Sequence, residues 1–156
     1  MTKRARNKDL LYLLLLVTVL AGIPLAIHAY NNHLWQTETN GGARVFALTA
    51  HSRLGWIPGS VSGYEAITLY NEEQPGQKLE LRVKQGDLVA LKLTSSDVIH
   101  GFSMKDFGIF IEDGIRPGKV TLVTFRADRV GTFTFSCNII CGDEHKNMQG
   151  TLIVTA

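Results

Sequence analysis

Two kinds of hydrophobic pattern divide the chain. From Leu10 to Ile27, eighteen consecutive residues carry no charge and are rich in leucine and valine. Such a run lies at the lower edge of the roughly 17–25 apolar residues that cross a bilayer as a helix. Beyond it, short stretches alternate between apolar and polar residues, which is typical of half-buried β-strands. The pattern therefore predicts an apolar N-terminal helix followed by a β domain.

Alternation is clearest in residues 78–84, where Leu79, Leu81 and Val83 separate charged or polar residues. Similar reasoning predicts strands at residues 44–50, 88–93, 107–112, 119–126, 131–136 and 151–154, with turns at 85–87 and 114–118. Residues 51–59 are expected to form an irregular loop, in which His51 is solvated and Trp56 packs at the end of the domain. Seven or eight short strands indicate an all-β fold class, a Greek-key β-sandwich.

Charge on either side of the apolar run predicts its orientation. Four basic residues precede the run and none follows it directly, so the positive-inside rule places the N-terminus in the cytoplasm. We expect a basic head at 1–9, a single transmembrane anchor at 10–30, a linker at 31–42 and the β domain at 43–156. The β domain would then lie on the periplasmic or exterior side of the cell membrane. The alternative is a cleaved signal peptide, with Ile27-His28-Ala29 as a weak cleavage signal.

The net charge of +2 comes from the N-terminal segment. Residues 1–30 hold four of the 16 basic residues and one of the 14 acidic residues, which leaves 12 basic and 13 acidic residues in the rest of the chain. Proteins that bind nucleic acid usually carry a strongly basic surface. Since the folded part is close to neutral, the sequence gives no support for a nucleic-acid partner.

Candidate metal ligands gather in one short segment. Cys137, Cys141, His145 and Met148 fall within twelve residues, and the chain has no other cysteine. The segment lies between two predicted strands, 131–136 and 151–154, so it forms a loop at one end of the sandwich. Soft sulfur donors combined with imidazole select copper, zinc or iron over magnesium or calcium. A loop of this kind on a β-sandwich favours copper.

Two other interpretations of the cysteine pair remain open. Outside the cytoplasm, an even number of cysteines often forms disulfides. Structural zinc is the other, although its loops more often combine a C-x2-C pair with a distant second pair of ligands. Because His145 and Met148 follow at short spacing, the metal site is favoured over the disulfide.

His100 supplies the imidazole that such a loop would need from elsewhere in the chain. It lies in an apolar stretch after a strand-ending turn, where a histidine is often only a core residue. Because the loop lacks a second imidazole, we expect His100 to be a ligand. Met104, four residues later, is expected to pack in the core.

These residues resemble a known family. His100 followed by Cys137-x3-Cys141-x3-His145-x2-Met148 is similar to the dinuclear copper A (CuA) cupredoxin domain of subunit II of haem-copper oxidases, including cytochrome c oxidase, and of nitrous oxide reductase. The resemblance covers roughly residues 79–154. It implies two copper ions bridged by Cys137 and Cys141. His100 and His145 would each bind one copper, with Met148 as a weak axial ligand and the backbone carbonyl of Ile139 as the remaining ligand.

The resemblance also implies a function. Such a subunit accepts single electrons from a periplasmic cytochrome c or small copper protein and passes them to haem in the catalytic subunit, without making bonds itself. Two features depart from many family members: Ile139 stands where a glutamate reaches a magnesium ion, and the W-x-W cluster of electron entry is absent. A free-standing anchored cupredoxin for electron transfer or copper delivery is the alternative. A disulfide-stapled binding module, which would hold no metal, is the third.

Overall fold

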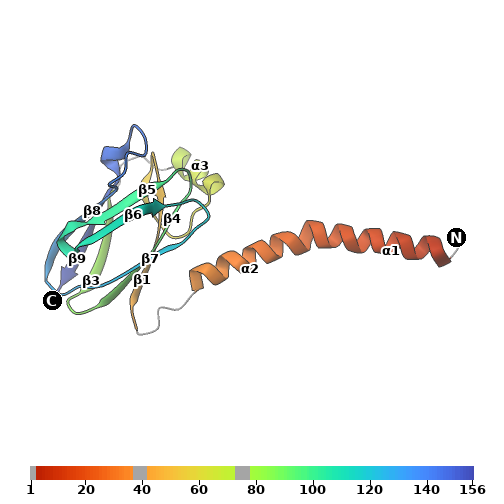
Figure 1. Cartoon of the computed structure of the whole chain (residues 1–156), viewed down its shortest axis with the longest axis horizontal. Coiled ribbons are helices and arrows are strands. Elements are labelled where there is room, and N and C mark those ends of the chain that lie inside the picture. Colours follow the sequence, from red (N-terminus) through yellow and green to blue (C-terminus); the bar gives the residue numbers. More distant parts are fainter. Residues whose placement is uncertain (1–2, 37–41, 73–77) are drawn as a thin grey trace. The chain divides into compact units, whose positions relative to one another are not determined.

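The computed structural model describes residues 3–36, 42–72 and 78–156. The chain forms two compact units, an N-terminal helix within residues 1–37 and a β domain within residues 38–156 (Figure 1). The β domain consists of two sheets. The predicted fold class, a β-sandwich with one N-terminal apolar helix, is confirmed.

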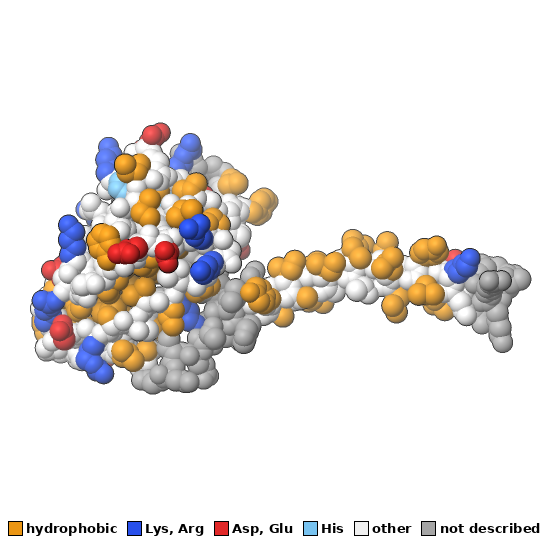
Figure 2. All heavy atoms as spheres, in the orientation of Figure 1, with side chains coloured by type: hydrophobic (Ala, Val, Ile, Leu, Met, Phe, Trp, Pro, Cys, Tyr) orange, Lys and Arg blue, Asp and Glu red, His pale blue; other side chains and the backbone are white. Residues whose placement is uncertain are grey.

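The N-terminal helix is continuous and contains one π-helical turn. It comprises α1 (Lys3–Val17), a π-helical turn (Thr18–Gly22) and α2 (Ile23–Gln36). The π turn ends just before Pro24, and such local adjustments accommodate a residue without an N–H group. The span Asn7–Tyr30 contains an 18-residue window with a mean hydropathy of 2.6, so this helix is long and apolar enough to cross a membrane. Hydrophobic side chains follow the helix along the face seen in Figure 2.

The helix extends past the end of the predicted anchor. It runs to Gln36, so residues 31–36 of the segment expected to be a linker are helical. Residues 37–41 of that segment lie outside the described part of the chain.

Both sheets mix parallel and antiparallel pairs. One has the order β2-β1-β4-β7 and the other the order β3-β9-β8-β5-β6, and β1–β4 and β3–β9 are the parallel pairs. The strands are β1 (Arg44–His51), β2 (Gly55–Pro58), β3 (Leu79–Lys84), β4 (Leu88–Ser95), β5 (His100–Met104), β6 (Ile109–Ile115), β7 (Thr121–Arg126), β8 (Gly131–Ser136) and β9 (Gln149–Thr155). In β3 the predicted alternation is confirmed, because Leu81 and Val83 are buried between exposed charged residues.

Three local predictions need correction. Within the expected loop 51–59, β2 pairs with β1, with Trp56 opposite Ala50. The strand expected at 107–112 begins later and extends into the expected turn 114–118, because a 3₁₀ turn occupies Lys105–Phe107 and β6 runs from Ile109 to Ile115. Helix α3 (Gly63–Glu72) and strand β5 lie in stretches for which the sequence predicted no element.

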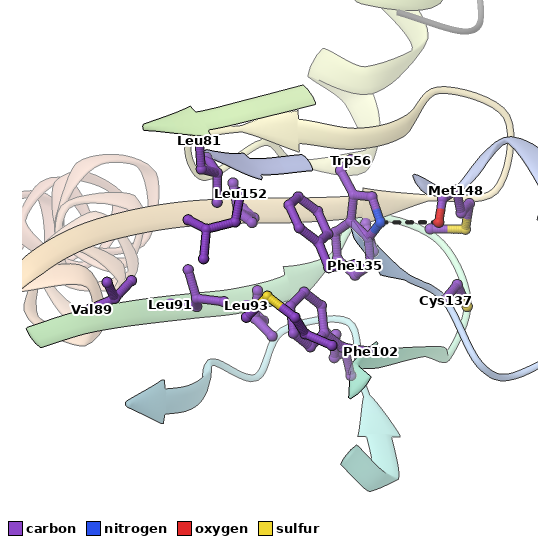
Figure 3. Packing of buried hydrophobic residues seen from close by; sticks show 14 of the residues in the cluster. Trp56, Leu81, Val89, Leu91, Leu93, Phe102, Phe135, Cys137, Met148 and Leu152 are labelled. Carbon is purple, nitrogen blue, oxygen red and sulfur yellow. Dashed lines mark hydrogen bonds between the residues drawn. The ribbon is translucent and has the colours of Figure 1, made fainter. Parts of the chain in front are cut away.

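Aromatic and aliphatic side chains fill the space between the sheets (Figure 3). Trp56, Phe102 and Phe135 form its aromatic part, and Trp56 is only 4% exposed. The packing predictions for Trp56 and Met104 are therefore confirmed. This core reaches the end of the sandwich that carries the candidate metal ligands, since it includes Cys137 and Met148.

Candidate metal centre

The loop between β8 and β9 holds the two thiols side by side. Cys137 directly follows β8, and its amide donates a hydrogen bond of 3.0 Å to the carbonyl of Met148, which closes the loop. The Sγ atoms of Cys137 and Cys141 are 3.8 Å apart, and both cysteines are free. A disulfide has an S–S distance of about 2.05 Å. The structure therefore presents a pair of thiols rather than a bridge.

Three further donors surround this pair, and each lies against one sulfur. The Ile139 carbonyl oxygen is 3.1 Å from Cys137 Sγ. Met148 Sδ is 3.1 Å and His145 Nδ1 is 3.5 Å from Cys141 Sγ. His145 opens a 3₁₀ turn (His145–Asn147), which brings His145 and Met148 back toward Cys141. The four loop residues predicted from spacing are thus brought together, and Ile139 joins them through its backbone.

His100 approaches the thiols from a distant part of the chain. It is the first residue of β5, and its side chain is fully buried. A ring nitrogen of His100 and the two sulfurs lie within 4.8 Å of one another. The predicted association of His100 with the cysteine loop is therefore present in the fold.

The His100 ring has one nitrogen satisfied and one left open. Nε2 lies 2.7 Å from Asp97 Oδ1, and a carboxylate can only accept, so Nε2 carries the proton. Nδ1 is buried and has no hydrogen-bond partner among the described residues. A buried polar atom without a partner costs roughly 1–3 kcal/mol. A soft metal ion beside the two thiols would use this lone pair, so the donor set fits copper.

Gly101 allows the strand of His100 to approach the cysteine loop. Its amide donates a hydrogen bond of 3.2 Å to Cys137 Sγ. A Cβ atom at this position would lie 1.9 Å from Asn138 Oδ1, which is a severe overlap. Since only glycine lacks that atom, the sequence His100-Gly101 lets β5 bring a ring nitrogen and an amide to the same sulfur.

The charges of the site fit a bound cation. Burial favours the neutral thiol of Cys137, but the His100 ring and the backbone of Ile139 and Gly101 outweigh burial and lower its pKa to about 6. Burial and the neighbouring Cys137 charge raise the pKa of Cys141 to about 12. Two thiolates 3.8 Å apart repel each other unless a positive charge lies between them. A metal ion would supply that charge and allow both sulfurs to ionise.

Asp97 is a functional residue that the sequence analysis missed. Although burial opposes its charge, hydrogen bonds from His100 and Ser52 hold the pKa of Asp97 well below its usual range. The Asp97 contact likewise outweighs burial and raises the pKa of His100. A carboxylate that orients a ligating histidine is a common feature of metal sites. The sequence signal for this role is that Asp97 precedes the candidate ligand His100 by only three residues.

His51 has a local role in the backbone. Its Nδ1 accepts the amides of Arg53 and Leu54, both at 3.2 Å, and burial lowers its pKa. The expectation of a merely solvated loop histidine is therefore wrong, since this partly buried ring holds the turn between β1 and β2.

Comparisons with known proteins agree with this site. A family model described as "Cytochrome C oxidase subunit II, periplasmic domain" matches residues 77–155. Cytochrome c oxidase subunit 2 of Thermus thermophilus is 40% identical over 74 residues, which are 47% of this chain and 53% of that protein. Nitrous-oxide reductase of Pseudomonas fluorescens is 35% identical over 79 residues, 48% of this chain and 12% of the reductase. The chain thus spans about half the length, or less, of these relatives.

A solved structure supports the same fold. The periplasmic domain of subunit II of cytochrome oxidase from Bradyrhizobium japonicum superposes with a TM-score of 0.52 at 19% identity, over 76% of this chain and 88% of that one. At this identity the likeness establishes the fold alone. The family model is more specific, because it matches 79 of the 156 residues and includes every candidate ligand. The chain therefore belongs to the family of cytochrome c oxidase subunit II, and the matched residues 77–155 make up most of its β-sandwich.

Proposed function

We propose that the chain is the electron-entry subunit of a haem-copper oxidase or related respiratory reductase, with a dinuclear CuA centre in its β domain. The ligands would be Cys137 and Cys141 as bridging thiolates, with His100, His145, Met148 and the carbonyl of Ile139. The observation that carries the proposal is the pair of free thiols 3.8 Å apart with the open Nδ1 atom of buried His100 beside them. A single-copper cupredoxin would need only one of these two cysteines.

Bound copper would supply a one-electron redox couple, and the chain's own residues would keep its ligands in place. Cys137 is fixed by the hydrogen bond from the Gly101 amide to its sulfur and by the hydrogen bond that its own amide donates to the Met148 carbonyl. His100 is fixed by Asp97 and by its position in β5. Ligands held in one geometry favour fast electron transfer, because little rearrangement accompanies the change of charge. This arrangement suits a relay that makes no bonds.

Partner binding would use the surface around the metal loop. Ile140 is 88% exposed directly beside Cys141, and Val98 and Ile99, next to His100, are also exposed. Exposed apolar side chains that border a redox site are suited to brief contact with a protein partner. We infer that a cytochrome c or small copper protein delivers electrons at this end, and that a haem-bearing catalytic subunit receives them. Because Ile139 has no carboxylate, we expect no magnesium bridge through its side chain.

The apolar helix would anchor the subunit. The span Asn7–Tyr30 would cross the cell membrane once, with the basic head in the cytoplasm and the β domain in the periplasm. The proposed segments are a head at 1–9, an anchor at 10–30, a connection at 31–42 whose first six residues continue the helix, and the copper domain at 43–156.

The proposal is tested on the full chain purified from membranes in mild detergent. We expect two copper ions per chain, an electron paramagnetic resonance spectrum of one electron shared by both ions, and co-purification with haem. A copper protein that elutes without haem would favour a free-standing cupredoxin. A chain that takes up no copper after reduction and reloading would refute both functions.

A further inference from the structure

Trp56 contacts the metal loop although it offers no ligand atom. It lies in β2, and its indole Nε1–H donates a hydrogen bond of 3.3 Å to the carbonyl of Met148 (Figure 3). The same carbonyl accepts the amide of Cys137 at 3.0 Å. Two hydrogen-bond donors, one in β2 and one directly after β8, therefore hold the backbone of Met148. The thioether of Met148 lies 3.1 Å from Cys141 Sγ.

The indole ring also packs against the strands that carry two other candidate ligands. Its edge-to-face contacts are with Phe102, at a centroid distance of 5.4 Å, and with Phe135, at 6.0 Å. Phe102 lies two residues after His100, and Phe135 lies two residues before Cys137. Aromatic pairs of this kind stabilise the packing beyond the area they bury. A single side chain thus touches the three segments that deliver His100, Cys137 and Met148.

The residue before Trp56 brings its strand close to the same loop. Gly55 has a φ of +77°, and a Cβ atom placed on it would lie 3.5 Å from the Asn147 carbonyl. The left-handed backbone at Gly55 turns the chain into β2 at the point where Trp56 enters the core. The strand β2 therefore lies near the end of the metal loop at Gly55 as well as at Trp56.

We propose that Trp56 is a positioning residue of the metal centre, which holds the Met148 backbone through its indole N–H and thereby fixes the thioether beside Cys141. This inference rests on the proposed copper site. The physical reason is that Met148 ends the loop, and β9 begins only at the next residue. Without the indole donor, the Met148 carbonyl keeps one hydrogen bond, the one from the Cys137 amide.

The test replaces Trp56 in the full-length chain with 3-benzothienylalanine, which has the shape of tryptophan but sulfur in place of the N–H group. We expect this variant to lose copper to a chelator about tenfold faster than the wild type does. Replacing a residue that supports a metal ligand typically costs about 10–100-fold in metal affinity, and this expectation lies at the low end of that range. The reduction potential and the copper hyperfine pattern should change as well. In copper-free protein, hydrogen exchange at the Cys137 amide should become faster, because its acceptor is held less firmly.

Two variants separate positioning from packing. Trp56→Phe also removes the donor and should show the same spectral change together with a loss of stability. Val89→Ala makes a cavity in the core at the start of β4, and only the other end of that strand leads to the metal site. This variant should therefore lower the stability of the domain and leave the reduction potential and the copper spectrum unchanged. If the benzothienyl variant matches the wild type in copper loss, spectrum and exchange at Cys137, the inference is overturned. If the wild type binds no copper but exchange at Cys137 still depends on the indole N–H, the proposed function fails and the positioning role stands.

Discussion

The two sheets of the sandwich contribute differently to the metal centre. The five-stranded sheet presents the candidate metal ligands. Strand β5 begins with His100, β8 leads into Cys137 and β9 follows Met148. The four-stranded sheet presents no donor, but it supplies Trp56 from β2 and leads through β4 to Asp97. In the proposed centre, the five-stranded sheet would therefore hold the ligands, and the four-stranded sheet would add two residues that orient them, Trp56 and Asp97.

This division predicts a graded response to substitution. Changing a thiolate ligand should alter how many metal ions bind, whereas changing a supporting residue or the weak thioether ligand should alter how tightly they bind or at what potential. Changing a residue away from both, as in α3, should alter only the stability of the domain. Four substitutions test this order, beginning with the largest expected effect.

Cys141→Ser should have the largest effect. Cys141 touches Cys137, His145 and Met148, so its loss removes the sulfur at which most of the donors meet. We expect at most one copper ion per chain and a changed absorption and paramagnetic resonance spectrum. Ile140→Ser is the matched control, because it alters an exposed neighbour in the same loop and should keep both ions. A two-copper spectrum that survives Cys141→Ser would disprove the ligand assignment.

Asp97→Asn should weaken copper binding without changing the number of bound ions. An amide can present its NH₂ group to His100 Nε2, which would disfavour the tautomer with an open Nδ1. We expect a decrease in copper affinity of roughly 10–100-fold, measured by competition with a chelator. Asp87→Asn is the control, since Asp87 also accepts a backbone amide, that of Lys84, but at the turn between β3 and β4. If the two variants bind copper with equal affinity, Asp97 does not support the metal site.

The sequence predicts the strands with regular alternation and misses one strand in each sheet, β5 and β2. In β3 and β8, apolar residues alternate with polar ones, and in the metal loop the donors are close in sequence, so local pattern is sufficient. By contrast, β2 has only four residues, including a glycine and a proline, and it exists because it pairs with β1. The contact of Trp56 with Met148 joins residues 92 positions apart, and no local pattern encodes it.

Helix α3 was missed for a different reason. It begins with Gly63 and presents Tyr64 and Ile67 to solvent, so its apolar residues do not form one buried stripe. Its N-terminus nevertheless carries a recognisable signal, because Ser62 and Glu65 have the spacing of a capping box. The structure forms that box, with the amides of Ser62 and Glu65 each bound to the other residue's side chain. Capping residues could therefore have predicted this helix where periodicity could not.

Met148→Leu should shift the potential and keep both metal ions. Leucine has a similar volume, so the buried site stays filled, but it offers no electron pair to the copper beside Cys141. Loss of that donor destabilises the more highly charged oxidised state, so we expect the potential to rise by up to ~59 mV, a tenfold change in a one-electron equilibrium. Met104→Leu, at an equally buried methionine in β5, should leave the potential unchanged. Loss of copper in Met148→Leu would show that the thioether is a structural ligand.

Ser62→Ala should have the smallest effect and leave the copper spectrum unchanged. It removes the side chain that accepts the Glu65 amide, and loss of such a cap costs about 1 kcal/mol. Hydrogen bonds from Ser62 lower the pKa of Glu65, so their contribution is complete above the unfolded pKa of about 4.3 and is lost as pH falls through the folded pKa. Chemical denaturation should therefore show a smaller difference between wild type and Glu65→Ala in acid than at neutral pH, whereas the Ser62→Ala difference should change less, because alanine keeps the backbone amide that binds the Glu65 carboxylate. Glu65→Ala and the double variant complete a cycle, and additive losses would mean that the two residues do not act as one cap.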